Sequence, residues 1–153
     1  MTGVQTCALP IFLSTDHKDC DENFADFENA IVKGETETAK AAFEKMKNEF
    51  ETHFKMEEGT LFPEFEAKSG MSCGPTEVMR REHEQMRFNI GMLEKAMESG
   101  NKSQILGLCE SFNILVQQHN SKEEQILYTM CDNVLFGESV ALIEKMKDVK
   151  QNG

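Results

Sequence analysis

The chain contains only four histidines, and their spacing constrains the fold more than any other feature. The two histidines of a pair lie 36 positions apart, and a second pair repeats the first 66 positions later. A glutamate follows the second histidine of each pair by four positions. The repeated pattern comprises His17, His53 and Glu57, and then His83, His119 and Glu123. Imidazole and carboxylate groups in a two-fold repeat are typical of a centre that holds two metal ions.

Apolar residues recur at helical spacing on both sides of each histidine, and no segment shows the alternation of a strand. The patterns predict four long helices, over residues 12–33, 35–68, 75–98 and 102–133, and a shorter one over residues 138–149. Short polar connections make successive helices antiparallel neighbours. The expected fold class is therefore all-α, an up-down-up-down four-helix bundle with a short extra C-terminal helix.

Some details of this fold depend on individual residues. Pro63 lacks a backbone donor, so we expect it to kink or end the second helix. The apolar stripe of the fourth helix is expected to run through Leu108 and Ile126, and that of the fifth through Val140.

Length and charge narrow the class of protein. The 153 residues suffice for one domain with a sizeable core, which we expect over residues 12–150. A formal charge of -11 argues against nucleic acid and against a membrane surface as partners, because both favour basic proteins. No apolar run reaches the ~20 residues that span a bilayer. Five cysteines without a paired motif indicate reduced thiols, and so a cytoplasmic location.

The first eleven residues read MTGVQTCALPI, which resembles the translation of a common sequencing adapter. We therefore expect residues 1–11 to be adapter-derived or disordered, and the natural start of the chain to be missing. A short signal peptide is the alternative, but no Lys or Arg precedes its apolar run.

The spacing of four positions places His53 and Glu57 on one helix face, one turn apart, and His119 and Glu123 likewise. In a bundle, carboxylates from diagonally opposite helices can bridge two ions. The mixed ligand set favours iron ahead of manganese or zinc. The alternative is a metal-free bundle with four buried histidines and two glutamates at the edge of the apolar stripes.

The surroundings of the predicted site are rich in Met, Phe and Leu, which would suit a small neutral ligand such as dioxygen or nitric oxide. Leu61 and Leu127 lie one turn beyond the two glutamates, and we expect them to cap the site. Glu58, beside Glu57, is expected to face solvent.

The segments HFKMEEGTLFP, REHEQMR and QQHNSKEEQILYTMCD resemble those of hemerythrin-like, or HHE cation-binding, proteins. The resemblance covers roughly residues 17–130 and the C-terminal helix. It implies a four-helix bundle with a non-haem centre of two iron ions. On this resemblance His17 and His53 would bind one iron, His83 and His119 would bind the other, and Glu57 and Glu123 would bridge them.

One position departs from the oxygen-carrying members of that family. They have a fifth histidine four residues after the third, where this chain has Arg87. Asp21, Glu58 or water is expected to fill the gap. The departure favours binding or sensing of dioxygen or nitric oxide over reversible oxygen carriage. The alternatives are a di-iron oxidase, a nitric-oxide-stress or iron-handling protein, and a metal-free helical interaction module; the sequence does not identify a protein partner.

Overall fold

The computed structural model describes residues 8–152, and this range is helical almost throughout, without a strand. The α-helices are α1 (Ala8–Lys33), α2 (Thr36–Met56), α3 (Phe62–Ser69), α4 (Pro75–Ser99), α5 (Lys102–Lys122), α6 (Tyr128–Val134) and α7 (Ser139–Asn152). The π-helical segment η2 (Glu57–Leu61) joins α2 to α3, and η3 (Glu123–Leu127) joins α5 to α6. A 3-10 turn, η4 (Phe136–Glu138), precedes α7. The predicted all-α class is confirmed.

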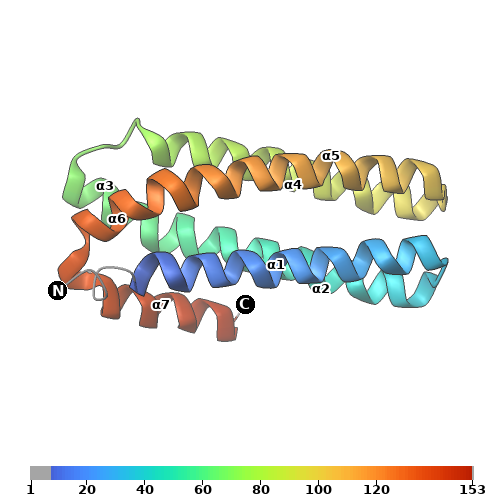
Figure 1. Ribbon diagram of the computed structural model, residues 1–153, viewed down its shortest axis with the longest axis horizontal. Coiled ribbons are helices and arrows are strands. Elements are labelled where there is room, and N and C mark those ends of the chain that lie inside the picture. Colours follow the sequence, from blue (N-terminus) through green and yellow to red (C-terminus); the bar gives the residue numbers. More distant parts are fainter. Residues whose placement is uncertain (1–7, 153) are drawn as a thin grey trace.

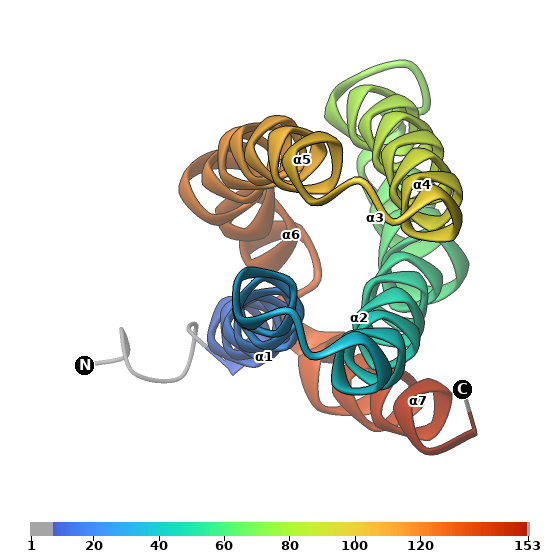
Figure 2. The ribbon, with the colours of Figure 1, turned by 90° about the vertical axis from the view of Figure 1, so that its right-hand side faces the viewer.

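Four long helical rods run alternately up and down and form the bundle (Figure 1). They are α1, then α2 with η2 and α3, then α4, and then α5 with η3 and α6. Viewed along the bundle, they surround a common centre, and α7 packs outside them against α1 and α2 (Figure 2). Gly34 and Gly100 end α1 and α4 with φ angles of 72° and 71°. Glycine adopts this left-handed conformation without steric cost, so the chain reverses there within a few residues.

Helix α1 begins at Ala8, four residues before the expected start. Leu9 is fully buried in one cluster with Leu13, so the first turn of α1 packs against the bundle. The rest of the predicted N-terminal segment, residues 1–7, lies outside the described residues.

The two π-helical segments begin at Glu57 and Glu123, the glutamates of the repeated sequence pattern. A π turn holds one more residue than an α turn, so it rotates the residues that follow it around the helix. Consequently Leu127 is buried, whereas Ile126, which was expected in the core, is 57% exposed. Pro63 lies in the first turn of α3, where a missing donor is tolerated, and the helix continues instead of ending there.

The C-terminal part of the core also differs from expectation. Leu108 is only partly buried, and the neighbouring Cys109 points fully inward. In α7 the prediction for Val140 is wrong, because it is 75% exposed, while Leu142 is buried. Within residues 8–152 no single helix is long and apolar enough to cross a membrane; Lys102–Val134 and Phe136–Asn152, bent by 82°, meet that test only as a pair.

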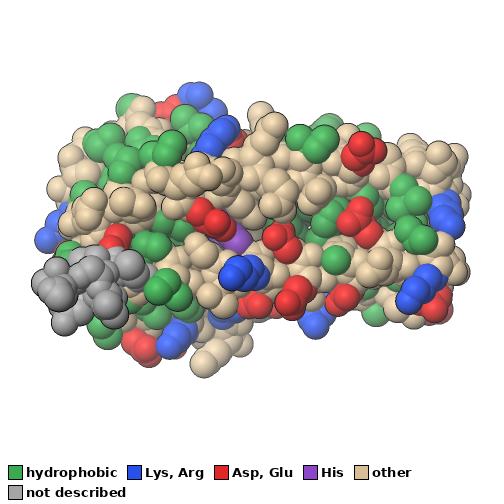
Figure 3. Space-filling view, in the orientation of Figure 1, with side chains coloured by type: hydrophobic (Ala, Val, Ile, Leu, Met, Phe, Trp, Pro, Cys, Tyr) green, Lys and Arg blue, Asp and Glu red, His purple; other side chains and the backbone are tan. Residues whose placement is uncertain are grey.

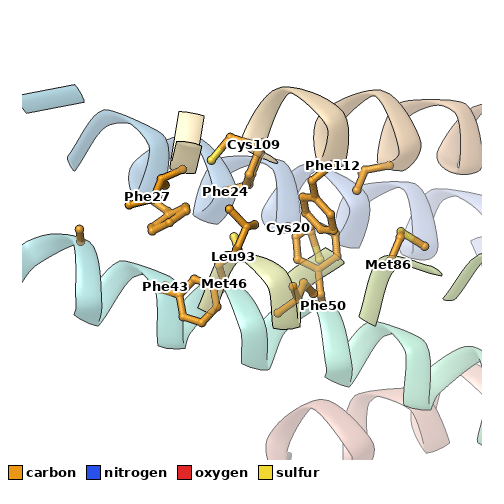
Figure 4. Packing of buried hydrophobic residues seen from close by; sticks show 14 of the residues in the cluster. Cys20, Phe24, Phe27, Phe43, Met46, Phe50, Met86, Leu93, Cys109 and Phe112 are labelled. Carbon is orange, nitrogen blue, oxygen red and sulfur yellow. The ribbon is translucent and has the colours of Figure 1, made fainter. Parts of the chain in front are cut away.

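Two apolar clusters fill the bundle, and on three of the four rods, those of His17, His83 and His119, the histidine lies between them. The larger cluster contains interlocking aromatic rings, among them Phe50 and Phe112 with centroids 5.2 Å apart (Figure 4). The second cluster includes Leu61, Phe62 and Leu127. On α1, for example, His17 lies between Leu13 of the second cluster and Cys20 of the first. The polar site is therefore enclosed by apolar packing along the bundle axis.

Candidate metal centre

The six residues of the repeated pattern meet inside the bundle. Each of α1, α2, α4 and α5 contributes one histidine, and η2 and η3 each contribute a glutamate. None of the six is more than 3% exposed: His17, His53, Glu57, His83, His119 and Glu123. On the face shown in Figure 3, histidine appears only as a small area beside acidic side chains. The four imidazoles and two carboxylates thus form one buried polar cluster.

The six side chains form two groups that share both glutamates. The first ligand group contains His17, His53, Glu57 and Glu123, and the second ligand group contains Glu57, His83, His119 and Glu123. Within each group, one ligand-type atom from every residue lies within 4.8 Å of the others. This is the spacing of atoms that could surround one cation, so the structure brings together all six predicted residues in two adjacent candidate sites.

Each glutamate directs one oxygen to each group. Oε2 of Glu57 lies 3.3 Å from Nε2 of His53, and its Oε1 lies 3.0 Å from Nε2 of His83. Oε1 of Glu123 lies 2.9 Å from Nε2 of His17, and its Oε2 lies 3.2 Å from Nε2 of His119. Both carboxylates therefore have the orientation that a bridge between two metal ions requires.

The other ring nitrogen of every histidine contacts a carboxylate from a different rod. These supporting carboxylates are Glu124 for His17 at 2.6 Å, Asp16 for His53 at 2.7 Å, Glu58 for His83 at 2.6 Å and Glu82 for His119 at 2.8 Å. An Nδ1–H that donates to a carboxylate leaves Nε2 free for a metal and fixes the orientation of the ring. All four Nε2 atoms accordingly point toward the two shared glutamates.

Three of the supporting carboxylates are themselves paired with a cation. Lys150 of α7 contacts Asp16 at 2.6 Å, Lys122 contacts Glu82 at 2.5 Å, and Arg87 contacts Glu58 at 3.1 Å. Helix α7 thus reaches the site through one lysine. The expectation that Glu58 faces solvent is wrong, since its side chain is 26% exposed and lies between a histidine and an arginine.

Tyr128, the single tyrosine of the sequence, lies inside the first ligand group and was missed by sequence reasoning. Its phenol oxygen is 2.5 Å from Oε2 of Glu57 and 2.8 Å from Oε1 of Glu123. It is also 3.0 Å from Nε2 of His17 and 3.4 Å from Nε2 of His53. The phenol therefore contacts a ligand-type atom of every member of that group.

The second ligand group contains no such hydroxyl. Four of its buried atoms lack hydrogen-bond geometry to any described residue: Oε1 of Glu57, Nε2 of His83, Nε2 of His119 and Oε2 of Glu123. They lie in pairs, 3.0 Å apart for Glu57 and His83 and 3.2 Å apart for Glu123 and His119. Unsatisfied polar atoms are rare in protein interiors because each costs about 1–3 kcal/mol. One cation among them would satisfy all four, so the donor set fits a metal ion.

Without metal, the charges of the cluster favour ion pairs. Burial opposes the charged form of His119, but Glu123 and Glu82 outweigh it and raise its pKa to about 9. The pKa of His53 is likewise raised well above its ordinary value, because Glu57 and Asp16 outweigh burial. Burial opposes ionisation of Glu123 too, yet the adjoining histidines lower its pKa well below the usual range.

For the phenol of Tyr128, in contrast to the histidines and glutamates, the surroundings favour the uncharged form. Burial, together with the negative charges of Glu123 and Glu57, raises the pKa of Tyr128 well above its ordinary value. In the metal-free protein Tyr128 therefore keeps its proton and donates a hydrogen bond to one of the two carboxylates.

Comparison with known protein families adds independent evidence. Residues 11–131 match the family model for the hemerythrin HHE cation-binding domain. The chain belongs to this family. Members of the HHE family bind metal cations, and the buried His and Glu groups of this HHE domain could hold a metal. Neither the curated proteins nor the solved structures contain a match to this chain.

Neither of the two side chains expected to replace the histidine that is absent at Arg87 lies among the ligand-type atoms of this HHE domain. Neither Asp21 nor Glu58 belongs to either ligand group. Arg87 pairs with Glu51 and Glu58, and Asp21 instead accepts a hydrogen bond from Gln117 at 3.1 Å. The additional oxygen in the centre, that of Tyr128, lies in the first ligand group, whereas Arg87 is on the helix of His83, which belongs to the second.

The 66-position repeat could have revealed more of the HHE site than the six residues. Asp16 aligns with Glu82 and Glu58 aligns with Glu124, so the supporting carboxylates obey the same offset as the histidines. A further aligned pair is the aromatic one, Phe62 and Tyr128. A single carboxylate or aromatic residue in a helix does not indicate a site. The signal is that each of these residues recurs 66 positions away, in step with the histidines.

Proposed function

We propose that this HHE domain holds two iron ions in the two ligand groups and binds or senses a small neutral ligand, dioxygen or nitric oxide. The observation that carries the proposal is the sharing of both buried glutamates, Glu57 and Glu123, by two groups of nitrogen and oxygen atoms. Imidazole and carboxylate ligation suits iron, and the same ligands would accept manganese or zinc less specifically. The six residues of the repeated pattern would be the metal ligands.

The residues around the site support binding of a small apolar molecule. Leu61 and Leu127 are at most 1% exposed, and Phe62 and Met56 pack in the same cluster. Such apolar walls limit the access of water and favour a small neutral ligand. When bound, the iron ions would supply the reversible exchange of electrons with that ligand. The protein would orient the imidazoles through the supporting carboxylates and keep the site dry.

Metal analysis tests the proposal directly. Protein purified from iron-supplied cells, or reconstituted anaerobically with ferrous iron, is expected to contain two irons per chain, one for each ligand group. Glu57→Gln and Glu123→Gln should each lower the content, because each removes a ligand from both groups. Glu44→Gln, an exposed change on α2, is the matched control and should not. Wild-type protein without iron after reconstitution would contradict the proposal.

A second measurement separates binding from catalysis. A binding or sensing protein takes up one equivalent of dioxygen or nitric oxide and then stops, even with excess reductant. Steady consumption would instead indicate the alternative, a di-iron oxidase or a nitric-oxide-stress protein. A cytoplasmic location is part of the proposal, supported by the free thiols of Cys20, Cys73, Cys109 and Cys131, which reducing compartments preserve.

A further inference from the structure

The two halves of the centre are related by the sequence repeat, yet one pair of aligned residues makes them unequal. Phe62 and Tyr128 follow the two π-helical segments at equivalent positions. Each ring lies against a histidine of its own half: Phe62 is stacked 5.9 Å from His83, and Tyr128 is stacked 5.5 Å from His17. The halves therefore present the same ring in the same place, and they differ by one hydroxyl group.

That hydroxyl lies where a ligand of a metal would lie. Around a metal with bonds of about 2.0–2.2 Å, neighbouring ligand atoms are roughly 3 Å apart. The phenol oxygen is 2.5 to 3.4 Å from the four ligand-type atoms of the first ligand group. Tyr128 is fully buried, and α6 follows η3 directly, so Glu123 and Tyr128 are positioned by one continuous rod. The phenol oxygen is therefore already in contact with this group in the metal-free structure.

The opposite half has no protein atom in the equivalent position. Phe62 supplies only carbon, and the four buried ligand-type atoms of the second ligand group lack hydrogen-bond geometry to any described residue. A metal held there by His83 and His119 would share the two glutamates and would have one protein ligand fewer.

From this asymmetry, and resting on the proposed function, we propose that the phenol oxygen of Tyr128 is a ligand of the iron in the first ligand group, and that the iron in the second ligand group keeps the open position for the small ligand. As the bond from iron(III) to oxygen forms, the phenol O–H bond breaks and the proton leaves to solvent. The metal charge favours this, because a bound cation is the largest local charge and stabilises a coordinated anion. No change of oxidation state is involved.

Resonance Raman spectroscopy of the iron(III)-loaded full chain tests the first half of the proposal. Ligation by Tyr128 should give visible charge-transfer absorption and enhanced tyrosine ring vibrations. Because the sequence has one tyrosine, ring-deuterated tyrosine labels this residue alone, and the vibrations must shift. In Tyr128→Phe, which keeps the ring but lacks the hydroxyl, both signals should vanish when the variant is compared with wild-type protein reconstituted to the same iron content. Wild-type protein with two irons and no tyrosine vibrations would overturn the inference but leave the proposed function standing; absence of iron would overturn both.

Azide, a small anion that binds open positions on iron(III), tests the second half. Wild-type protein should bind one azide per chain, at the second ligand group. Tyr128→Phe should bind two, because neither ligand group then has a phenol oxygen. Phe62→Tyr should weaken azide binding at least tenfold, since it adds a phenol to the second group. Iron content and circular dichroism show whether this variant folds. Equal azide stoichiometry in wild-type protein and Tyr128→Phe would overturn the asymmetry.

Discussion

Nδ1 of His83 on α4 lies 2.6 Å from a carboxylate oxygen of Glu58 on η2, the residue next to the shared Glu57. The repeat reproduces this relationship in Glu124 and His17, also at 2.6 Å. In each π-helical segment the first glutamate thus faces the metal position, and the glutamate that follows it is hydrogen-bonded to a histidine of another rod. An ordinary α turn would separate such neighbours by about 100° around the helix axis. Both nevertheless serve one site, because they contact the two nitrogens of the same imidazole: Glu57 lies 3.0 Å from Nε2 of His83, and Glu58 lies 2.6 Å from its Nδ1.

Glu58→Gln is expected to weaken metal binding without removing a ligand. The amide keeps the shape of the carboxylate but loses the charge that orients His83 and raises its basicity, and such changes typically cost about 10–100-fold in metal affinity. Competition with a chromophoric chelator measures the affinity, and Glu44→Gln serves as control because Glu44 is exposed on α2. Equal affinities of the two variants would show that the hydrogen bond to Glu58 is irrelevant to the metal.

Arg87→Lys is expected to affect stability more than metal binding. Arg87 makes paired contacts of 2.9 to 3.2 Å to Glu51 and Glu58, and lysine keeps the charge but cannot form two such forks. We expect a loss of about 1 kcal/mol in the free energy of unfolding. Urea denaturation measures it. Because Glu58 still accepts the hydrogen bond from His83, the iron content should stay unchanged, and loss of iron would contradict this separation.

Leu127→Ala is expected to open the site and to leave a cavity. Leu127 is 1% exposed, and truncation of a buried leucine costs about 2–5 kcal/mol of stability. Water and dioxygen should then reach the centre more easily, so iron(II)-loaded protein should oxidise faster in air. The matched control is Ile126→Ala, since Ile126 is the preceding residue and is 57% exposed; it should change stability by about 0.5 kcal/mol. An unchanged oxidation rate in Leu127→Ala would refute the capping role.

The stability of the metal-free protein should depend on pH through its buried ion pairs. The pKa of His119 is raised from 6.5 to about 9, so its protonation stabilises the fold fully below pH 6.5, and this contribution disappears as the pH rises to about 9. Glu123, whose pKa is lowered, stabilises the fold above its ordinary value of 4.5, and this contribution disappears as the pH falls. The free energy of unfolding should therefore be greatest between about pH 4.5 and pH 6.5.

Urea unfolding of chelator-treated protein at a series of pH values measures this profile. The free energy of unfolding should decline from pH 6.5 to 9. In His119→Asn the decline should be smaller but still present, because the pKa values of His17, His53 and His83 are raised as well. A profile that is flat over this range in the wild-type protein would contradict the ion-pair interpretation.

Much of the fold was predictable because the spacing of apolar residues along the sequence indicates where helices form. The recurrence of apolar residues around His17 and His53 indicated the correct helices, and the short connections between the long helices indicated antiparallel neighbours. The same reasoning failed at Ile126, because a π turn changes the register and nothing in local spacing announces it. The prediction for Val140 failed for a related reason: only the docking of α7 against α1 and α2 decides which face of that helix is covered.

The sequence by itself determined the rods and the chemistry each one carries, since one histidine per rod and two glutamates in register follow from a repeat of 66 positions. Only the tertiary structure decided which atoms meet. The contacts of Glu58 with His83 and of Asp16 with His53 join different rods. Tyr128 became part of the centre through the π turn that precedes it. Such contacts depend on the rotation of each helix about its axis, which is fixed only when all four rods pack together.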